Sequence, residues 1–236
     1  MGSAGRSVSQ PSVAAWPSLP QGYSQSFYKM AVNGELWKDI SISLLRVLKG
    51  FSIAFALAFG LGMIRFLLPG TAKYYEYMVQ FFRSVPPLAM IPLLILWCGI
   101  GETTKTVIIV LASFFPMYLN IVKGFTGCDK NFWKWGNVRI LCGRKFLRIV
   151  LPCAAADILV GMRIGLGYSW RAIIGAEMVA ASTGLGHMIL FAQQMSRTDK
   201  VIVGILTIGM VGYVTDRLFG LAISKMLKGS CDNGWD

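Results

Sequence analysis

The sequence contains few charged residues and lacks the short motifs that mark many enzymes. Charged side chains make up 14% of its 236 residues, whereas soluble domains carry about 25%. The single histidine, His187, lies outside any H-E-x-x-H or other metal-ligand spacing, and no G-x-S-x-G supplies a nucleophile. We therefore expect neither a catalytic site nor a bound metal, and we interpret His187, beside Gly186, as a turn residue.

The sequence also lacks a phosphate-binding loop and any close pair of cysteines. No G-x-x-x-x-G-K-S/T occurs, so we interpret the two G-L-G runs, at 60–62 and 165–167, as glycines for helix packing. The cysteines are odd in number and form no C-x-x-C pair, which predicts neither a disulfide framework nor a zinc site. We therefore expect five free thiols: Cys98, Cys128, Cys142, Cys153 and Cys231.

Long apolar runs and an excess of basic residues are what the sequence does contain. Hydrophobic residues make up 55% of the chain and its mean hydropathy is +0.57, which is typical of a membrane protein. The formal net charge is +12, but the basic residues stand in the connections between apolar runs and not on an aromatic-rich soluble face. The charge therefore indicates membrane topology and gives no reason to expect a nucleic-acid partner.

The apolar runs divide the chain into a membrane domain with a short tail at each end. Residues 1–22 show no charged segment followed by an apolar core, so we expect no cleavable signal, and we assign 1–26 to a flexible tail. A helical pattern starts near Phe27, with Asp39 and Ser41 as N-cap candidates. Residues 229–236 form the C-terminal tail. The transmembrane domain, 27–228, is expected to be all-α with five spans, near 51–68, 78–100, 106–122, 158–181 and 201–223.

The second of these spans contains three prolines that a regular helix cannot accommodate. Pro86, Pro87 and Pro92 each remove a backbone donor and clash with the preceding turn. In lipid, such breaks are tolerated only where protein or a water-filled cavity satisfies the freed backbone groups. We therefore expect this span to face the bundle interior, and we assign Arg83 and Pro86 to a translocation pathway.

The connection from Lys123 to Pro152 carries seven basic residues against a single acid, Asp129. Short loops rich in Lys and Arg stay on the cytoplasmic side. We therefore expect this loop and the C-terminus to be cytoplasmic, with the N-terminal tail outside and Arg46 and Lys49 in an interfacial lead-in to the first span. The remaining basic residues assigned to the cytoplasmic side are Arg65, Lys73, Arg83, Arg217, Lys225 and Lys228.

Aromatic residues alternate with charge in the same loop. Phe132, Trp133 and Trp135 flank Lys134, which predicts a short amphipathic helix able to dock on a partner. The alternative is a loop that only anchors on anionic lipid headgroups. Composition does not choose between the two.

The fourth span carries the membrane domain's most distinctive polar pattern. Arg163, Trp170 and Glu177 recur every seven residues and so share one helical stripe. Because charged groups facing lipid are costly, we expect this stripe and Arg171 to face the bundle interior and line the pathway. The alternative places Arg163 and Glu177 at the two membrane ends. A second stripe of small residues is suited to close helix contact: Gly165, Ser169, Ala172 and Ala176.

Several long segments resemble one known family. They are SISLLRVLKGF (41–51), FFRSVPPLAMIPLLILWCGIGETTK (81–105), LPCAAADILVGMRIGLG (151–167) and AEMVAASTGLGHMILFAQQMSRTDKV (176–201). These segments closely resemble the permease subunit of binding-protein-dependent ABC importers of the nitrate, sulfonate, taurine and bicarbonate type. The resemblance covers about 19–228. In the family, one more span commonly precedes the Leu-Pro that matches Leu19-Pro20, and this sequence lacks it.

The resemblance implies a type I importer fold in the cell inner membrane and a pathway for a small anion. It also implies three partners: an ABC ATPase subunit that uses the ATP, an extracytoplasmic solute-binding protein, and a second permease copy. No cofactor is expected on this chain. The rival hypotheses are a self-sufficient channel or secondary carrier, which would need coupling-ion residues at midplane and inverted repeats, and a membrane enzyme, for which the sequence has no catalytic constellation.

The resemblance also assigns the basic loop to ATPase coupling. The family's loop holds a Glu-Ala-Ala motif, then a glycine, and a closing Leu-Pro. Leu151 and Pro152 match the closing pair, whereas the Glu-Ala-Ala position reads Lys134-Trp135-Gly136 without gaps. The alternative match, of 139–141 to the family's Arg-x-Leu, makes the loop about three residues short, with Cys142 or Gly143 at the glycine position. In either match the motif departs from the family pattern. The residues assigned to coupling are Asn131, Phe132, Trp133, Lys134, Trp135, Gly136, Leu151 and Pro152.

Overall fold

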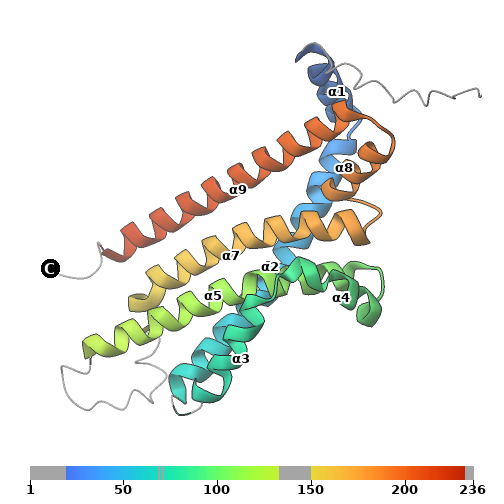
Figure 1. Ribbon diagram of the computed structural model, residues 1–236. Helices are drawn as coiled ribbons and strands as arrows, with labels where there is room; N and C mark the ends of the chain where they lie inside the picture. Colours follow the sequence, from blue (N-terminus) through green and yellow to red (C-terminus); the bar gives the residue numbers. More distant parts are fainter. Residues whose placement is uncertain (1–19, 69, 71, 133–149, 232–236) are drawn as a thin grey trace, which may run out of the picture.

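The computed structural model describes residues 20–68, 70, 72–132 and 150–231, and these contain helices and no strand. Four helices are long and apolar enough to cross a membrane, and a bent pair brings the number to five if it counts as one span. The all-α class is thus confirmed, and the four or five candidate spans agree with the expectation of about five. The elements (Figure 1) are α1 Pro20–Val32, α2 Glu35–Leu67, α3 Ala72–Ser84, η2 Pro87–Met90, α4 Ile91–Cys98, α5 Glu102–Phe132, α7 Leu151–Ala180, α8 Leu185–Gln194 and α9 Thr198–Cys231.

Helix α5 lies antiparallel to α7 and also packs along α2, so these three helices form the body of the molecule (Figure 1). Small residues allow the close approach. A Cβ added to Gly62 in α2 would lie 2.7 Å from Ile121 Cγ2, and one added to Gly165 in α7 would lie 2.6 Å from Met117 Cγ. The predicted small-residue stripe of α7 is buried throughout, from Gly165 to Ala176. Helix-to-helix contact through small residues is therefore confirmed.

Only one glycine of each G-L-G run has this packing role. Gly62 and Gly165 face neighbouring helices, whereas Cβ atoms added to Gly60 and Gly167 would meet nothing within 4 Å. Residues two apart on a helix point about 200° away from each other, so a single neighbour cannot contact both. The interpretation of all four as packing glycines is wrong for Gly60 and Gly167.

The proline-rich span is bent, as its sequence predicts, but it does not lie in the interior of the chain. The axes before and after Pro86 differ by 83°. Ile91 and Leu94 of α4 pack against α5 and α7, while Arg83 and Pro86 are exposed. The expectation that this span faces the interior is wrong for the single chain, because η2 and α4 lie against one side of the three-helix body.

One end of the molecule gathers the chain segments that the sequence assigns to the cytoplasmic side. The end of α2, the start of α3, the end of α5, the start of α7 and the end of α9 lie there, and α1 and α8 lie at the other end (Figure 1). Arg65 and Lys73 border the α2–α3 connection. Arg83, by contrast, occupies the last turn of α3 and does not belong to this group.

The helix boundaries near the N-terminus differ from those expected. Helix α1 begins at Pro20, so the end of the segment assigned to a flexible tail is helical, and residues 1–19 lie outside the described part. Gly34, in the left-handed region at φ 75°, separates α1 from α2. Asp39 and Ser41 therefore lie inside α2 and do not cap it. At the C-terminus, α9 continues to Cys231, into the segment assigned to a tail.

A short helix, α8, was not predicted from the sequence pattern. It places His187 within a helix, stacked on Phe191 with ring centroids 6.1 Å apart. The interpretation of His187 as a turn residue is therefore wrong. Gly184 introduces α8 at φ 111°, a conformation that glycine adopts readily and other residues do not.

Candidate functional site

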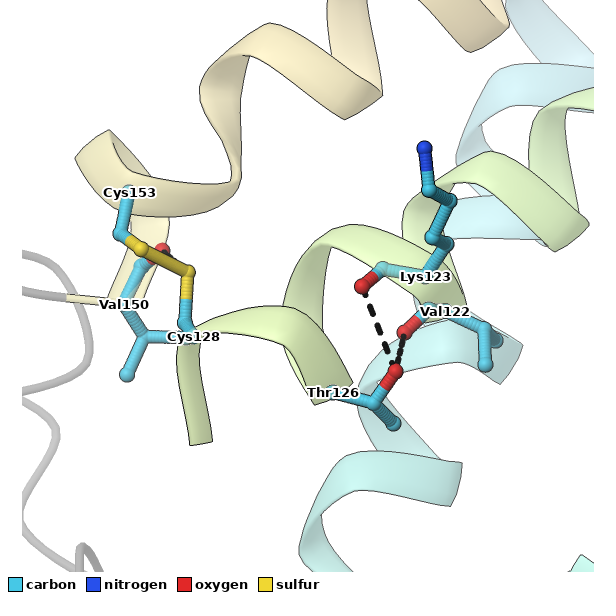
Figure 2. The surroundings of a disulfide bond; sticks show 6 residues. All are labelled: Val122, Lys123, Thr126, Cys128, Val150 and Cys153. Carbon is cyan, nitrogen blue, oxygen red and sulfur yellow. Dashed lines mark hydrogen bonds between the residues drawn. A yellow bond between two sulfur atoms is a disulfide. The ribbon is translucent and has the colours of Figure 1, made fainter. Parts of the chain in front are cut away.

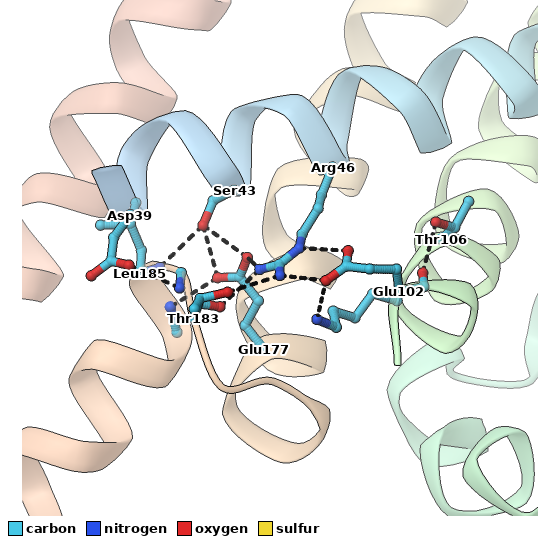
Figure 3. A network of polar contacts seen from close by, with 11 residues as sticks. Asp39, Ser43, Arg46, Glu102, Thr106, Glu177, Thr183 and Leu185 are labelled. Atoms are coloured by element: carbon cyan, nitrogen blue, oxygen red, sulfur yellow. Dashed lines mark hydrogen bonds and ion pairs between the residues drawn. The ribbon is translucent and has the colours of Figure 1, made fainter. Parts of the chain in front are cut away.

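A polar network joins α2, α5 and the α7–α8 turn at the end of the molecule that holds α8 (Figure 3). Arg46 of α2 is its centre. Its Nη1 donates to Glu177 Oε1 of α7 at 2.8 Å, and its Nε donates to Glu102 Oε2 of α5 at 2.8 Å. Arg46 Nη1 also donates to the carbonyl of Thr183 at 2.8 Å. One guanidinium thus ties together three helices and a turn.

Glu177 is fully buried, and hydrogen-bond donors surround its carboxylate. The Ser43 hydroxyl lies 2.8 Å from both carboxylate oxygens and donates to the carboxylate, and the backbone N–H of Gly186 donates to Oε2 at 3.0 Å. Gly184 leaves no room for a side chain, because an added Cβ would collide with the Glu177 carboxylate. A buried carboxylate with these partners is a rigid anchor.

The network includes functional candidates that the sequence pattern missed. Arg46, expected at the membrane interface, is 9% exposed, and Ser43 was not singled out at all. Asp39, expected to cap a helix, accepts a hydrogen bond from the Gly184 backbone N–H at 3.0 Å. A basic residue within an apolar helix was the available signal, since such a residue requires an acidic partner elsewhere in the bundle.

The stripe of α7 divides into a buried half and an exposed half. Glu177 and Trp170 face the interior, as predicted, and the Trp170 indole donates to the Ile208 carbonyl at 3.2 Å. Arg163 is about half exposed and pairs with Asp216 of α9 through both carboxylate oxygens, at 2.8 and 2.6 Å. Arg171 is exposed too, so the expectation of an interior position is wrong for both arginines in the single chain.

These two arginines line a groove of about 440 Å³ between α7 and α9. Arg171 lies over the ring of Tyr168, with its Cζ 5.5 Å from the ring centroid, so the ring face attracts the positively charged guanidinium. The structure therefore brings Arg163 and Arg171 together with Asp216 in one groove. It does not bring them together with Arg83, Pro86 or Glu177, the other residues assigned to the pathway.

The opposite end of the molecule holds the borders of the basic loop. Asn131 and Phe132 lie in the last turn of α5, and Leu151 and Pro152 in the first turn of α7, where proline is well suited. The remaining residues assigned to coupling, Trp133, Lys134, Trp135 and Gly136, lie outside the described residues.

A disulfide joins these two helix ends (Figure 2). Cys128 of α5 is bonded to Cys153 of α7, with their Cα atoms 6.1 Å apart. The same helices are paired by Lys123 Nζ and Asp157 Oδ1 at 3.0 Å. The expectation of free thiols is wrong for this pair, because antiparallel packing of α5 and α7 brings together cysteines 25 positions apart. Cys98 is free and exposed, and Cys142 and the side chain of Cys231 lie outside the described part.

Comparison with known proteins identifies the family of this chain. Residues 50–228 match the family described as binding-protein-dependent transport system inner membrane component. The chain is 35% identical to the putative aliphatic sulfonates transport permease protein SsuC of Bacillus subtilis, over 86% of this chain and 74% of that protein. It is 31% identical to the taurine transport system permease protein TauC of Escherichia coli, over 84% of this chain and 69% of that protein.

A third relative and a solved structure extend the comparison. The chain is 30% identical to the nitrate import permease protein NrtB of a Synechocystis strain, over 89% of this chain and 78% of that protein. Its fold matches that of a chain in the inward-facing methionine ABC transporter MetNI, with a TM-score of 0.59 and 16% identity, over 87% of this chain and 98% of that one. This protein therefore belongs to the inner-membrane components of binding-protein-dependent transport systems, the multi-pass permease subunits of ABC importers.

Proposed function

We propose that this permease imports a small oxyanion, with an aliphatic sulfonate as the first candidate. The observation that carries the proposal is the identity of the relatives. Permeases named for aliphatic sulfonates, taurine and nitrate all match more than four fifths of this chain. Their named substrates share a compact group with several oxygens, so one pathway chemistry serves all three.

The permease works with three partners. An ATPase subunit binds and uses ATP on the cytoplasmic side, and a solute-binding protein delivers the anion from outside. A second copy of this chain completes the pathway. The ends of α5 and α9 face the cytoplasm, because the connection from Lys123 to Pro152 carries seven basic residues against one acid.

Transport then follows from a rigid-body switch. ATP closes the two ATPase subunits, which draws the two coupling loops together and turns the paired permeases to face outward. Helices α5 and α7 are suited to transmit this movement. They are packed closely along their length, and the disulfide joins them beside the loop. ATP hydrolysis reopens the cytoplasmic side and releases the anion there.

Reconstitution tests this proposal. The permease is placed in liposomes with its ATPase and solute-binding protein, and uptake of labelled aliphatic sulfonate, taurine and nitrate is measured with and without ATP. We expect ATP-dependent uptake of at least one of them and no ATPase activity from the purified permease alone. Uptake that continues without ATP or without the binding protein would instead support a self-sufficient carrier.

A further inference from the structure

Three charged side chains that line the groove between α7 and α9 lie within the middle parts of these helices. Helix α7 has 30 residues and α9 has 34, whereas about 20 residues at 1.5 Å each cross the hydrocarbon core. Arg163 and Arg171 fall within the central part of α7, and Asp216 falls near the centre of α9. Within a membrane helix, a charged group is expensive unless it faces protein or water.

The groove between α7 and α9 gathers these three residues on one surface. Arg163 and Asp216 neutralise each other through two hydrogen bonds, at 2.8 and 2.6 Å. Arg171 has no ion-pair partner among the described residues and is held over the Tyr168 ring. Among the residues that line it, the groove thus carries one uncompensated positive charge.

We propose that this groove is a binding site for the transported oxyanion, with Arg171 as the residue that recognises it. The proposal rests on the proposed function and adds the site at which this chain meets its substrate. Arginine suits such a ligand because its planar guanidinium donates to two oxygens at once. Protection of the groove by the transported anion separates this ligand from a lipid headgroup, which carries similar oxygens.

Glycine gives this groove its width. Gly167 lines it one turn before Arg171, and an added Cβ would meet nothing within 4 Å. A side chain at this position would therefore occupy the groove without disturbing helix packing. Gly209 of α9 also has open space around it but is not a lining residue, so it provides a matched control.

The first test measures uptake in the reconstituted transporter. We expect Arg171→Gln to lower uptake of the transported anion by roughly tenfold or more. Arg171→Lys keeps the charge but loses the two-oxygen contact, and it should lower uptake to a smaller extent.

Gly167→Val should impair uptake of an aliphatic sulfonate more than that of the smaller nitrate. The controls Arg217→Gln and Gly209→Val should transport normally, and every variant should retain its membrane level and ATPase association.

The second test does not require transport. Gly167→Cys is introduced with Cys98→Ser, and its labelling by a sulfonate-bearing thiol reagent and by a trimethylammonium-bearing one is compared with that of the Cys98→Ser parent. We expect faster reaction with the anionic reagent, loss of this preference in Arg171→Gln, and protection by the transported anion.

Each remaining outcome would overturn one claim. If Arg171→Gln transports normally, or if Gly167→Cys shows no charge preference, the groove is not the anion site. If Gly167→Cys reacts with neither reagent, another chain covers the groove and the site assignment fails. An equal loss of assembly and uptake in Arg171→Lys would make Arg171 structural. If the wild type transports none of the three anions, the proposed function fails, whereas the reagent preference still decides the groove's affinity for anions.

Discussion

Glu177 shows how a single buried charge fixes its surroundings. Its carboxylate has no solvent exposure, so each of its lone pairs must be satisfied by protein donors. Ser43, Arg46 and the Gly186 backbone N–H supply these donors, and they come from positions far apart in the sequence. Removal of the charge leaves the donors in place without their acceptor, and this asymmetry makes the residue sensitive to substitution.

We expect Glu177→Gln to destabilise the permease by about 3 kcal/mol, since breaking a buried ion pair costs about 3–5 kcal/mol and Arg46 retains Glu102. The midpoint of thermal unfolding in detergent should fall accordingly. Glu76→Gln provides the control, because Glu76 is exposed and its ion pair with Arg65 is long, at 3.5 Å. Loss of this ion pair should change the free energy of unfolding by less than about 1 kcal/mol. Equal midpoints for the two variants would contradict the structural role of Glu177.

Helix packing at the scale of whole elements depends on which glycines face a neighbour. Gly62→Ala would press a methyl group against Ile121, and such overpacking typically costs about 1–3 kcal/mol. Gly60→Ala places its methyl group in open space and should stabilise α2 by about 0.5–1 kcal/mol, because alanine favours helix. Thermal unfolding of the two variants checks this prediction. Shifts of the same sign would show that α2 and α5 are not packed in this register.

The basic loop between α5 and α7 provides a second prediction at this scale. Trp133 and Trp135 supply the large apolar surface that commonly anchors an interface, so truncating either should cost about 2 kcal/mol, a loss of roughly thirtyfold in affinity for the ATPase. Co-purification of Trp133→Ala and Trp135→Ala with the ATPase, after correction for membrane level, measures this. Full association of both variants would favour the alternative of a headgroup anchor.

The sequence predicted the long elements better than the short ones. Long apolar runs and the prolines near Pro86 revealed the spans and the bend, because both are local signals. Helix α8 was missed because its ten residues follow a glycine at positive φ and are too few for a clear pattern. Arg46 and the disulfide were missed for a different reason, since each depends on a partner that only the packed helices bring near.

At the scale of the whole molecule, the two ends have distinct chemistry. One end carries the Arg46 network, and Cys98, the last residue of α4, comes four residues before Glu102 of that network. The other end holds the helix ends that border the basic loop, whose sequence contains Cys142. The stripe of Arg163, Trp170 and Glu177 on α7 runs between the two ends, yet only Trp170 and Glu177 are buried. Sequence spacing placed these residues on one stripe, but it could not predict which of their side chains the neighbouring helices bury.

This polarity predicts a labelling pattern in intact cells. A membrane-impermeant maleimide added outside should modify Cys98, which is exposed and free, and should leave Cys142 unmodified until the membrane is permeabilised. Cys98→Ser identifies the signal, and cells without the ATPase avoid masking of the loop by that subunit. Modification of Cys142 from outside would reverse the orientation proposed for the whole permease.

The Cys128–Cys153 bond makes the coupling segment a covalently closed ring in the oxidised protein. Every residue assigned to ATPase contact lies between these two cysteines, so the ring contains the entire segment. A chain cut once anywhere within it would keep its two halves, α1–α5 and α7–α9, as one species on a denaturing gel and release them only after a thiol reductant is added. Two separately expressed halves that contain these cysteines could therefore be joined into a single permease by oxidation alone.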